Sequence, residues 1–263
     1  MILLLPPSET KNAGGDGPPL DLNSLVLPEQ MPVRDQLCTD LTALCTDEPS
    51  AVRALKLGPT QFDALRRNRE IRSSGTMSAL LRYTGVLYDA LDATSLNDTQ
   101  WDCARDTLLI QSALFGLIGA ADLIPDYRLS FDSRLTPSLK KRWVEVGREI
   151  LERSTGTIID LRSEGYAALA PLPSRTNAHG VRVVTRTGDG QVRALNHFNK
   201  QAKGLFVRAV LEAGAPLTST NDLLTWAADE GYELSLTADG ALQLVVPTIS
   251  GRPGALRARL RSA

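Results

Sequence analysis

Cysteine and histidine are scarce in this chain of 263 residues, which contains three cysteines and two histidines. The cysteines are odd in number and form no Cys-x-x-Cys pair, which argues against a disulfide framework and favours a cytoplasmic location. Cys38 and Cys45 lie on a predicted helix, where we expect them to be buried as small hydrophobic side chains. His179 and His197 are too far apart, with too few other ligands, to predict a zinc site.

Long apolar segments and an excess of charge are also absent. No apolar run approaches the roughly 20 residues that a transmembrane helix requires. The apolar start MILLL is followed at once by Pro6-Pro7, so it predicts a first strand and not a signal peptide. The formal net charge of −1 excludes a protein that coats nucleic acid through overall positive charge. We therefore expect no membrane partner, and any anion site has to be local.

The chain has no Ser/Gly linker, low-complexity tract or internal repeat that would separate domains. We predict one compact domain over residues 1–250, followed by an Arg-rich tail over residues 251–263, and we favour a monomer. The sequence also lacks GxGxxG, P-loop, GxSxG and HExxH motifs, which removes the commonest dinucleotide, nucleotide, hydrolase and zinc-protease interpretations. We expect no cofactor.

The apolar pattern predicts strands and helices in a mixed order. Strands are expected at residues 1–5, 108–112 and 157–161, with hairpins over 181–195 and 232–246. Thr76 and Asn221 are expected to cap helices, and Phe62 is expected to be buried. This order predicts a mixed α/β fold in which helices wrap a mixed twisted sheet. The expected helices cover residues 33–44, 48–57, 60–71, 76–91, 97–104, 136–150, 198–213 and 221–226.

Polar residues follow two predicted strands and one broken apolar segment, residues 112–128. Mixed α/β sheets place ligands where strands end, so these residues are candidates for a site. Each could also belong to a turn or a helix cap, and the residues alone leave both interpretations open. The candidates are Ser8, Glu9, Lys11, Tyr127, Arg128, Arg162, Ser163, Glu164 and Tyr166.

Five segments carry motifs that occur together in one known family. They are LLPPSETK near the start, YTGVLYDAL at 83–91 with Gly85 and Tyr88, SALFGLIGAADLIPDYRLSF at 112–131, DLRSEGY at 160–166, and NKQAKGLFVR at 199–208 with Lys200, Lys203 and Gly204. From about Met1 to Val246 the chain resembles the YaaA family, which is linked to the peroxide stress response. The departures, such as Ala90 in place of a glycine, leave the charged positions intact.

The resemblance implies a compact mixed α/β domain with a positively charged cleft, a helix-hairpin-helix-like element and DNA binding in a peroxide stress protein. The matching hairpin is Leu55-Lys56-Leu57-Gly58-Pro59-Thr60, where a Gly-containing turn before a helix would direct N–H groups at a phosphate. A helix, Gly-Pro, helix corner is also a common structural unit. On the leading hypothesis, DNA phosphates are contacted by Lys56, Arg66 and Arg67, together with Lys200 and Lys203.

The alternative is an enzyme that acts on a small anionic or nucleoside-like substrate in the same cleft. Glu9 or Glu164 would then serve as acid or base beside Arg128 or Arg162, with Lys200 or Tyr166 stabilising negative charge. A scaffold without a ligand is a third interpretation, and the sequence leaves enzymatic activity open. The expected ligand-binding residues are Ser8, Lys11, Tyr88, Tyr127, Arg128, Arg162, Ser163, Lys203 and Gly204.

Overall fold

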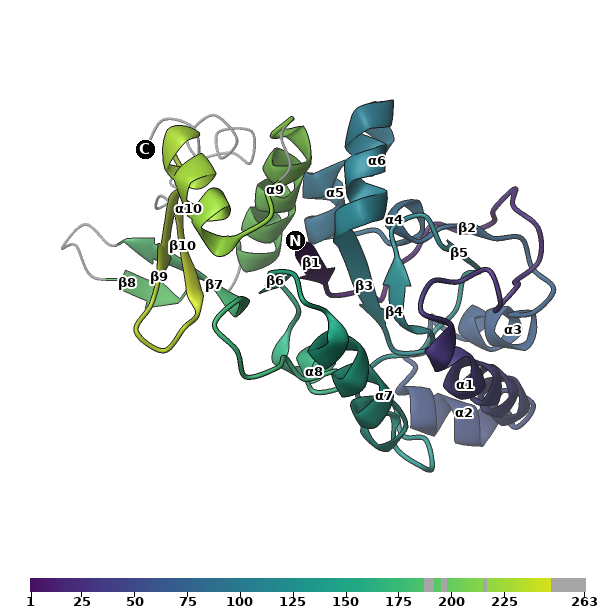
Figure 1. The fold of residues 1–263 in the computed structure, drawn as a ribbon. Helices are drawn as coiled ribbons and strands as arrows, with labels where there is room; N and C mark the ends of the chain where they lie inside the picture. The colour runs from purple at the N-terminus through teal and green to yellow at the C-terminus, as the bar shows by residue number, and fades with distance from the viewer. Residues whose placement is uncertain (187–191, 195–197, 215–216, 247–263) are drawn as a thin grey trace.

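The computed structural model describes residues 1–186, 192–194, 198–214 and 217–246. Eight strands form one mixed sheet in the order β4-β3-β1-β6-β7-β10-β9, with β8 also paired to β7 (Figure 1). The turn of the predicted 181–195 hairpin, His197 and the Arg-rich tail lie outside the described residues. The strands of this sheet are β1 (Ile2–Leu5), β3 (Leu108–Ser112), β4 (Gly116–Gly119), β6 (Ile158–Asp160), β7 (Ala178–Arg186), β8 (Val192–Ala194), β9 (Glu233–Leu236) and β10 (Leu242–Val246).

The centre of the sheet is parallel. Strands β3, β1, β6, β7 and β10 run in the same direction, whereas β4, β8 and β9 are antiparallel to their neighbours. Strand β1 lies between β3 and β6, and its Leu4 pairs with Leu109 on one side and Asp160 on the other. Because helices cover both faces of a parallel sheet, its strands can be apolar on both faces. This explains why β1 is the uninterrupted run ILLL.

Helices lie on both faces of the sheet. In Figure 1, α5, α6 and α9 are on one side, α7 and α8 are on the other, and α1, α2 and α3 gather beyond β4. Leu4 packs with α7, while its neighbours Leu3 and Leu5 belong to the larger core on the opposite face. The α-helices are α1 (Met31–Leu44), α2 (Glu48–Leu55), α3 (Asp63–Arg69), α4 (Ala79–Arg82), α5 (Val86–Leu91), α6 (Asp98–Thr107), α7 (Leu139–Arg153), α8 (Glu164–Ala167), α9 (Asn199–Glu212) and α10 (Thr220–Asp229).

The predicted mixed α/β class and mixed sheet are confirmed, and several helix starts follow from their capping residues. Asn97 forms a capping box with Gln100 at the start of α6. Ser138 caps α7 by accepting from the Lys141 N–H. The expected cap at Asn221 is wrong, because Ser219 accepts from the Asp222 N–H and α10 begins two residues earlier.

The expectation of one helix over residues 76–91 is wrong. The segment contains a short strand β2 (Met77–Ser78), which pairs with β5 (Leu123–Ile124), and then helices α4 and α5. Tyr83 is extended and Gly85 has φ +98, so the chain leaves the helical conformation between α4 and α5. A positive φ of this kind favours glycine, which explains why Gly85 stands there.

Cys38, Cys45 and Phe62 are all expected to be buried, but they differ in exposure. Cys38 and Cys45 are fully buried, as expected, and burial raises the pKa of the Cys38 thiol to about 12. Phe62 is 43% exposed, so its expected burial is wrong. It is the residue before α3 and therefore does not share the inward face of that helix. Among the described residues, no helix combines the length and apolar character that crossing a membrane requires.

Helices α5 and α9 cross at Gly204, and this contact tests how the fold holds α9 in place. A Cβ at Gly204 would lie 2.1 Å from the Leu87 carbonyl oxygen, so we expect Gly204→Ala to force the helices apart. The clash should outweigh the gain of about 1 kcal/mol in helix propensity, and the free energy of unfolding should fall by about 2 kcal/mol. Urea unfolding measures the difference.

The matched control is Gly180→Ala, because a Cβ at Gly180 has no atom within 4 Å and its φ is not in the left-handed region. We expect this variant to unfold at the same urea concentration as the native chain or a higher one. Equal midpoints for the Gly204→Ala variant and the native chain would contradict the close helix contact.

Candidate functional site

A cavity of about 580 Å³ opens at the carboxyl ends of β1 and β6. From β1 the chain continues to β3 on one side, whereas β6 lies on the other side, so this is the point where the strand order reverses. Open α/β sheets bind ligands in the crevice at such a switch point. We call it the switch-point cavity. Its lining is Pro6, Pro7, Ser8, Glu9, Thr10, Thr84, Gly85, Val86, Leu87, Tyr88, Phe131, Leu161, Ser163, Tyr166, Asn199, Lys200 and Lys203.

Seven residues that the sequence nominated therefore meet at one cavity. Three come from the loops after β1 and β6, two from the first turn and second turn of α9, and two from α5 and α8. Their functional roles remain predictions, although the fold brings them together from distant parts of the chain. They are Ser8, Glu9, Tyr88, Ser163, Tyr166, Lys200 and Lys203.

Other nominated residues lie outside the lining. Arg162 is buried, and its guanidinium is held by Asp160, Gln111 and the Ala170 carbonyl, so it is part of the support beneath the sheet edge. Glu164 is exposed as the first residue of α8. Gly204 lies one step behind the lining, where α9 touches α5.

The amino end of α9 has an unusual distribution of charge. Its N-cap residue, Phe198, makes no side-chain cap hydrogen bond, its first turn holds no acidic residue, and Lys200 is its second residue. Lys203 is 8% exposed, and its Nζ donates to the Leu161 carbonyl at 2.9 Å. Burial lowers the pKa of Lys203, although the nearby Asp160 opposes this shift. Neither lysine forms an ion pair with a residue in the described ranges.

Tyrosines form the layer beneath the cavity. Four of the five tyrosines of the chain gather there, and Tyr83 and Tyr127 share a hydrogen bond of 2.8 Å between their hydroxyls. Ser112 Oγ lies 2.7 Å from the Tyr127 hydroxyl, and the Tyr88 hydroxyl donates to the Pro6 carbonyl. Burial raises the pKa of all four tyrosines, which keeps their hydroxyls protonated and able to donate. The fourth is Tyr166, whose pKa rises to about 12.

Glu9 is the acidic residue of the lining, and Arg128 holds it. Arg128 Nη2 lies 2.9 Å from Glu9 Oε2, and the Arg128 backbone is fixed in turn by two hydrogen bonds with the Asn68 side chain. The Glu9 side chain is 60% exposed whereas that of Arg128 is 13% exposed. The arginine is therefore the fixed partner, and it orients the carboxylate at the mouth of the cavity.

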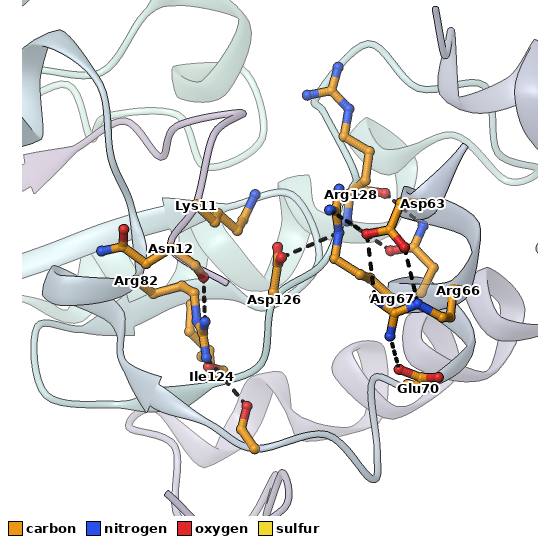
Figure 2. A network of polar contacts seen from close by, with 12 residues as sticks. Lys11, Asn12, Asp63, Arg66, Arg67, Glu70, Arg82, Ile124, Asp126 and Arg128 are labelled. Carbon is orange, nitrogen blue, oxygen red and sulfur yellow. Dashed lines mark hydrogen bonds and ion pairs between the residues drawn. The ribbon is translucent and has the colours of Figure 1, made fainter. Parts of the chain in front are cut away.

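Lys11 lies near two ion pairs, Glu9 with Arg128 and Asp126 with Arg67. Its Nζ is 4.2 Å from the centre of the Tyr127 ring and donates to the Ser8 carbonyl. Figure 2 shows Asp126 between Lys11 and Arg67, and Asp126 and Arg67 form an ion pair. The pKa of Lys11 is lowered to about 7, chiefly by burial and to a smaller extent by Arg128 and Arg67, while the carboxylates of Asp126 and Glu9 oppose the shift.

The three cations predicted to bind DNA are paired with carboxylates. Lys56 pairs with Asp132. Arg66 lies between Asp63 and Glu70, and Arg67 pairs with Asp63 and Asp126 (Figure 2). In the turn between α2 and α3, the Gly58 N–H donates to the Gln61 side-chain oxygen. None of the three cations lines the switch-point cavity, and DNA contact at this element stays a prediction.

Several lining residues were not nominated from the sequence, among them Val86, Phe131 and Asn199. One available signal was the start of α9, because a helix that begins NKQAK places two lysines where the helix dipole disfavours them. His179 is held by protein atoms, because its Nδ1 donates to the Gly240 carbonyl and its Nε2 lies 2.9 Å from Thr220 Oγ1. Within the described ranges, no three His, Cys, Asp or Glu side chains are grouped to hold a metal ion.

The lowered pKa of Lys11 predicts a pH-dependent contribution to stability. The unfolded chain holds this proton up to a pH of about 10.4, whereas the native state loses it near 7, so stability from this group rises with pH between those values. We expect the free energy of unfolding of the native chain to gain roughly 2 kcal/mol relative to Lys11→Met between pH 7.5 and 9. Urea unfolding at both pH values measures the gain. Lys140→Met is the control, because Lys140 is exposed. If the native chain and the Lys11→Met variant differed by the same free energy of unfolding at both pH values, the lowered pKa of Lys11 would be contradicted.

Comparison with known proteins confirms the resemblance seen in the sequence. A family model described as peroxide stress protein YaaA matches residues 1–237. A UPF0246 protein of Corynebacterium efficiens is 41% identical over 244 residues, which cover 90% of this chain and 95% of that protein. A UPF0246 protein of Streptomyces coelicolor is 35% identical over 261 residues, which cover 97% of each chain. The chain therefore belongs to the YaaA family of peroxide stress proteins.

Proposed function

We propose that this member of the family binds a small anionic molecule in the switch-point cavity and acts on it by acid–base catalysis. One observation carries the proposal: the amino end of α9 lies at the cavity with Lys200 and Lys203 and with no acidic residue in its first turn. The N–H groups at the amino end of a helix and the ammonium groups of lysines both attract negative charge. Lysines at this end of a helix repel its dipole, and a bound anion would reverse that cost.

The burial of Lys203 supports the same proposal. A charged side chain that is 8% exposed normally needs a partner of opposite charge, and among the described residues the one direct polar contact of Lys203 Nζ is the Leu161 carbonyl. An anion in the cavity would provide the missing charge. The cavity volume of about 580 Å³ suits a small molecule, because ligand sites usually measure ~300–1,000 Å³.

Glu9 is the residue best placed to move a proton. It is the carboxylate of the cavity lining, and Arg128 orients it from outside the lining. The Tyr166 hydroxyl stays protonated because burial raises its pKa to about 12, so it would donate a hydrogen bond to negative charge that develops on the substrate. Lys200 would stabilise the same charge. Glu164, nominated with Glu9, is outside the lining and has a weaker claim to this role.

Binding to duplex DNA through Lys56, Arg66 and Arg67 is the competing prediction. Each of these cations already has a carboxylate partner, so a phosphate would have to displace Asp132, Asp63, Glu70 or Asp126. The net charge of the chain, −1, adds no general attraction. Lys200 and Lys203 at the cavity have no carboxylate partner within the described ranges, so the cavity has the stronger claim.

The binding proposal predicts that Lys200→Ala weakens anion binding. A thermal-shift panel of sugar phosphates, nucleotides, carboxylates and a duplex oligonucleotide should identify small anions that raise the melting temperature of the native chain. Loss of one charged contact should weaken their binding roughly 10- to 100-fold, measured by calorimetry. Because Lys200 is exposed, its removal should leave the fold intact.

Lys140→Ala is the matched control, because Lys140 is the exposed second residue of α7 as Lys200 is of α9, and it lies away from the cavity. We expect it to bind every ligand as the native chain does. Equal affinities of the Lys200→Ala and Lys140→Ala variants would overturn the proposal. A shift with the duplex alone would favour the DNA prediction instead.

The catalytic part predicts that Glu9→Gln retains binding and loses turnover. Removal of a positioned acid or base should lower kcat about 10²- to 10⁴-fold while the affinity for the panel's best ligand changes little. Consumption of that ligand, followed by mass spectrometry, measures the rate. The exposed Glu149→Gln should behave like the native chain. Unchanged turnover in the Glu9→Gln variant would remove Glu9 from the mechanism.

A further inference from the structure

The wall of the switch-point cavity carries an aromatic ring that nothing in the proposed acid–base chemistry uses. Phe131 is 41% exposed and Val86 is 51% exposed, and both line this cavity. A large apolar side chain is costly to leave in water, and an exposed apolar wall inside a concave site usually marks a ligand-binding surface. The anion contacts of Lys200 and Lys203 therefore explain only part of the lining.

The Phe131 ring is held in a fixed position. The turn that presents it is closed by hydrogen bonds from Ser133 N–H to the Ser130 carbonyl and from Ser130 N–H to Ser133 Oγ. A Cβ at Gly165 would lie 2.3 Å from the ring, so the backbone of α8 rests directly against it. Tyr166 meets the ring in a T-shaped contact with 5.1 Å between centroids.

These contacts order the ring and still leave it partly exposed to the cavity. Among the described residues, Tyr166 is the one aromatic neighbour of Phe131, and its contact is edge-on. A planar group can therefore stack on the exposed part of the ring, as nucleobases stack on aromatic side chains in binding proteins. Because the protein has already fixed the ring, such a ligand would lose little affinity to ordering it.

We infer that the ligand of this cavity joins a planar aromatic ring to an anionic group, as a nucleoside monophosphate does. The ring stacks on Phe131, and the anionic group lies at the amino end of α9 beside Lys200 and Lys203. The Ser163 hydroxyl, which has no hydrogen-bond partner among the described residues, is on the lining and is available to a sugar hydroxyl. This inference rests on the proposed function and specifies its substrate class.

The experiment compares whole ligands with their halves. Calorimetry would measure the affinity of the full chain for the four ribonucleoside 5′-monophosphates, for ribose 5-phosphate and for adenosine. We expect at least one nucleotide to bind roughly 10-fold or more tightly than ribose 5-phosphate, because stacking adds to the phosphate contact. Adenosine should bind more weakly than the nucleotide, since it lacks the anionic group.

Substitutions at Phe131 assign the difference to its ring. Phe131→Ala should bind the preferred nucleotide about as weakly as ribose 5-phosphate and should leave ribose 5-phosphate affinity unchanged. Phe131→Tyr keeps a flat ring and should retain nucleotide binding. Phe62→Ala is the matched control, because Phe62 is 43% exposed and lies outside the cavity lining.

The outcomes separate this inference from the proposal on which it rests. Equal affinities for ribose 5-phosphate and all four nucleotides would overturn the aromatic part and leave anion binding in place. An equal loss of both ligands in the Phe131→Ala variant would also overturn it, because the ring would then act only on the shape of the site. Binding of adenosine as tight as that of the nucleotide would contradict the anionic part and, with it, the proposed function.

Discussion

Parallel pairing of β1 with β3 and β6 is the constraint on which the site depends. Parallel hydrogen bonding aligns the carboxyl ends of neighbouring strands at one edge of the sheet, and here Leu4 is paired with Leu109 and Asp160 at the same level. The chain leaves β1 toward β3, while β6 lies on the opposite flank, so the loops after β1 and β6 diverge. A crevice results between them. Glu9 follows β1 and Ser163 follows β6, which is why they face the same cavity.

Helix α9 closes the cavity from one face of the sheet, and its position is set by contacts on two sides. Gly204 lets it approach α5 at the Leu87 carbonyl, and Lys203 ties it to the Leu161 carbonyl after β6. The same lysine thus contributes to the position of the helix and to the charge of the cavity. The start of α9 therefore combines a packing contact of the fold with two lysines near the positive end of the helix dipole.

The cations of the chain fall into two groups that differ in their partners. Around α3, Arg66 and Arg67 alternate with Asp63, Glu70 and Asp126, so their charges cancel locally (Figure 2). Such exposed pairs add little stability, but they leave little net field to attract a phosphate. The lysines of α9 have no such partners among the described residues. The cations of the predicted hairpin are therefore paired with carboxylates, whereas the lysines at the cavity have no carboxylate partner in the described part of the chain.

The sequence by itself determined the local features: the buried strand ILLL, the capping box of Asn97 and Gln100, the family motifs and the mixed α/β class. The tertiary structure decided which exposed phenylalanine adjoins a cavity, Phe131 and not Phe62, and which arginines are already paired. The reason is physical. Strand and cap signals depend on residues a few positions apart, whereas burial and ion pairing depend on residues such as Arg67 and Asp126 that only folding brings together.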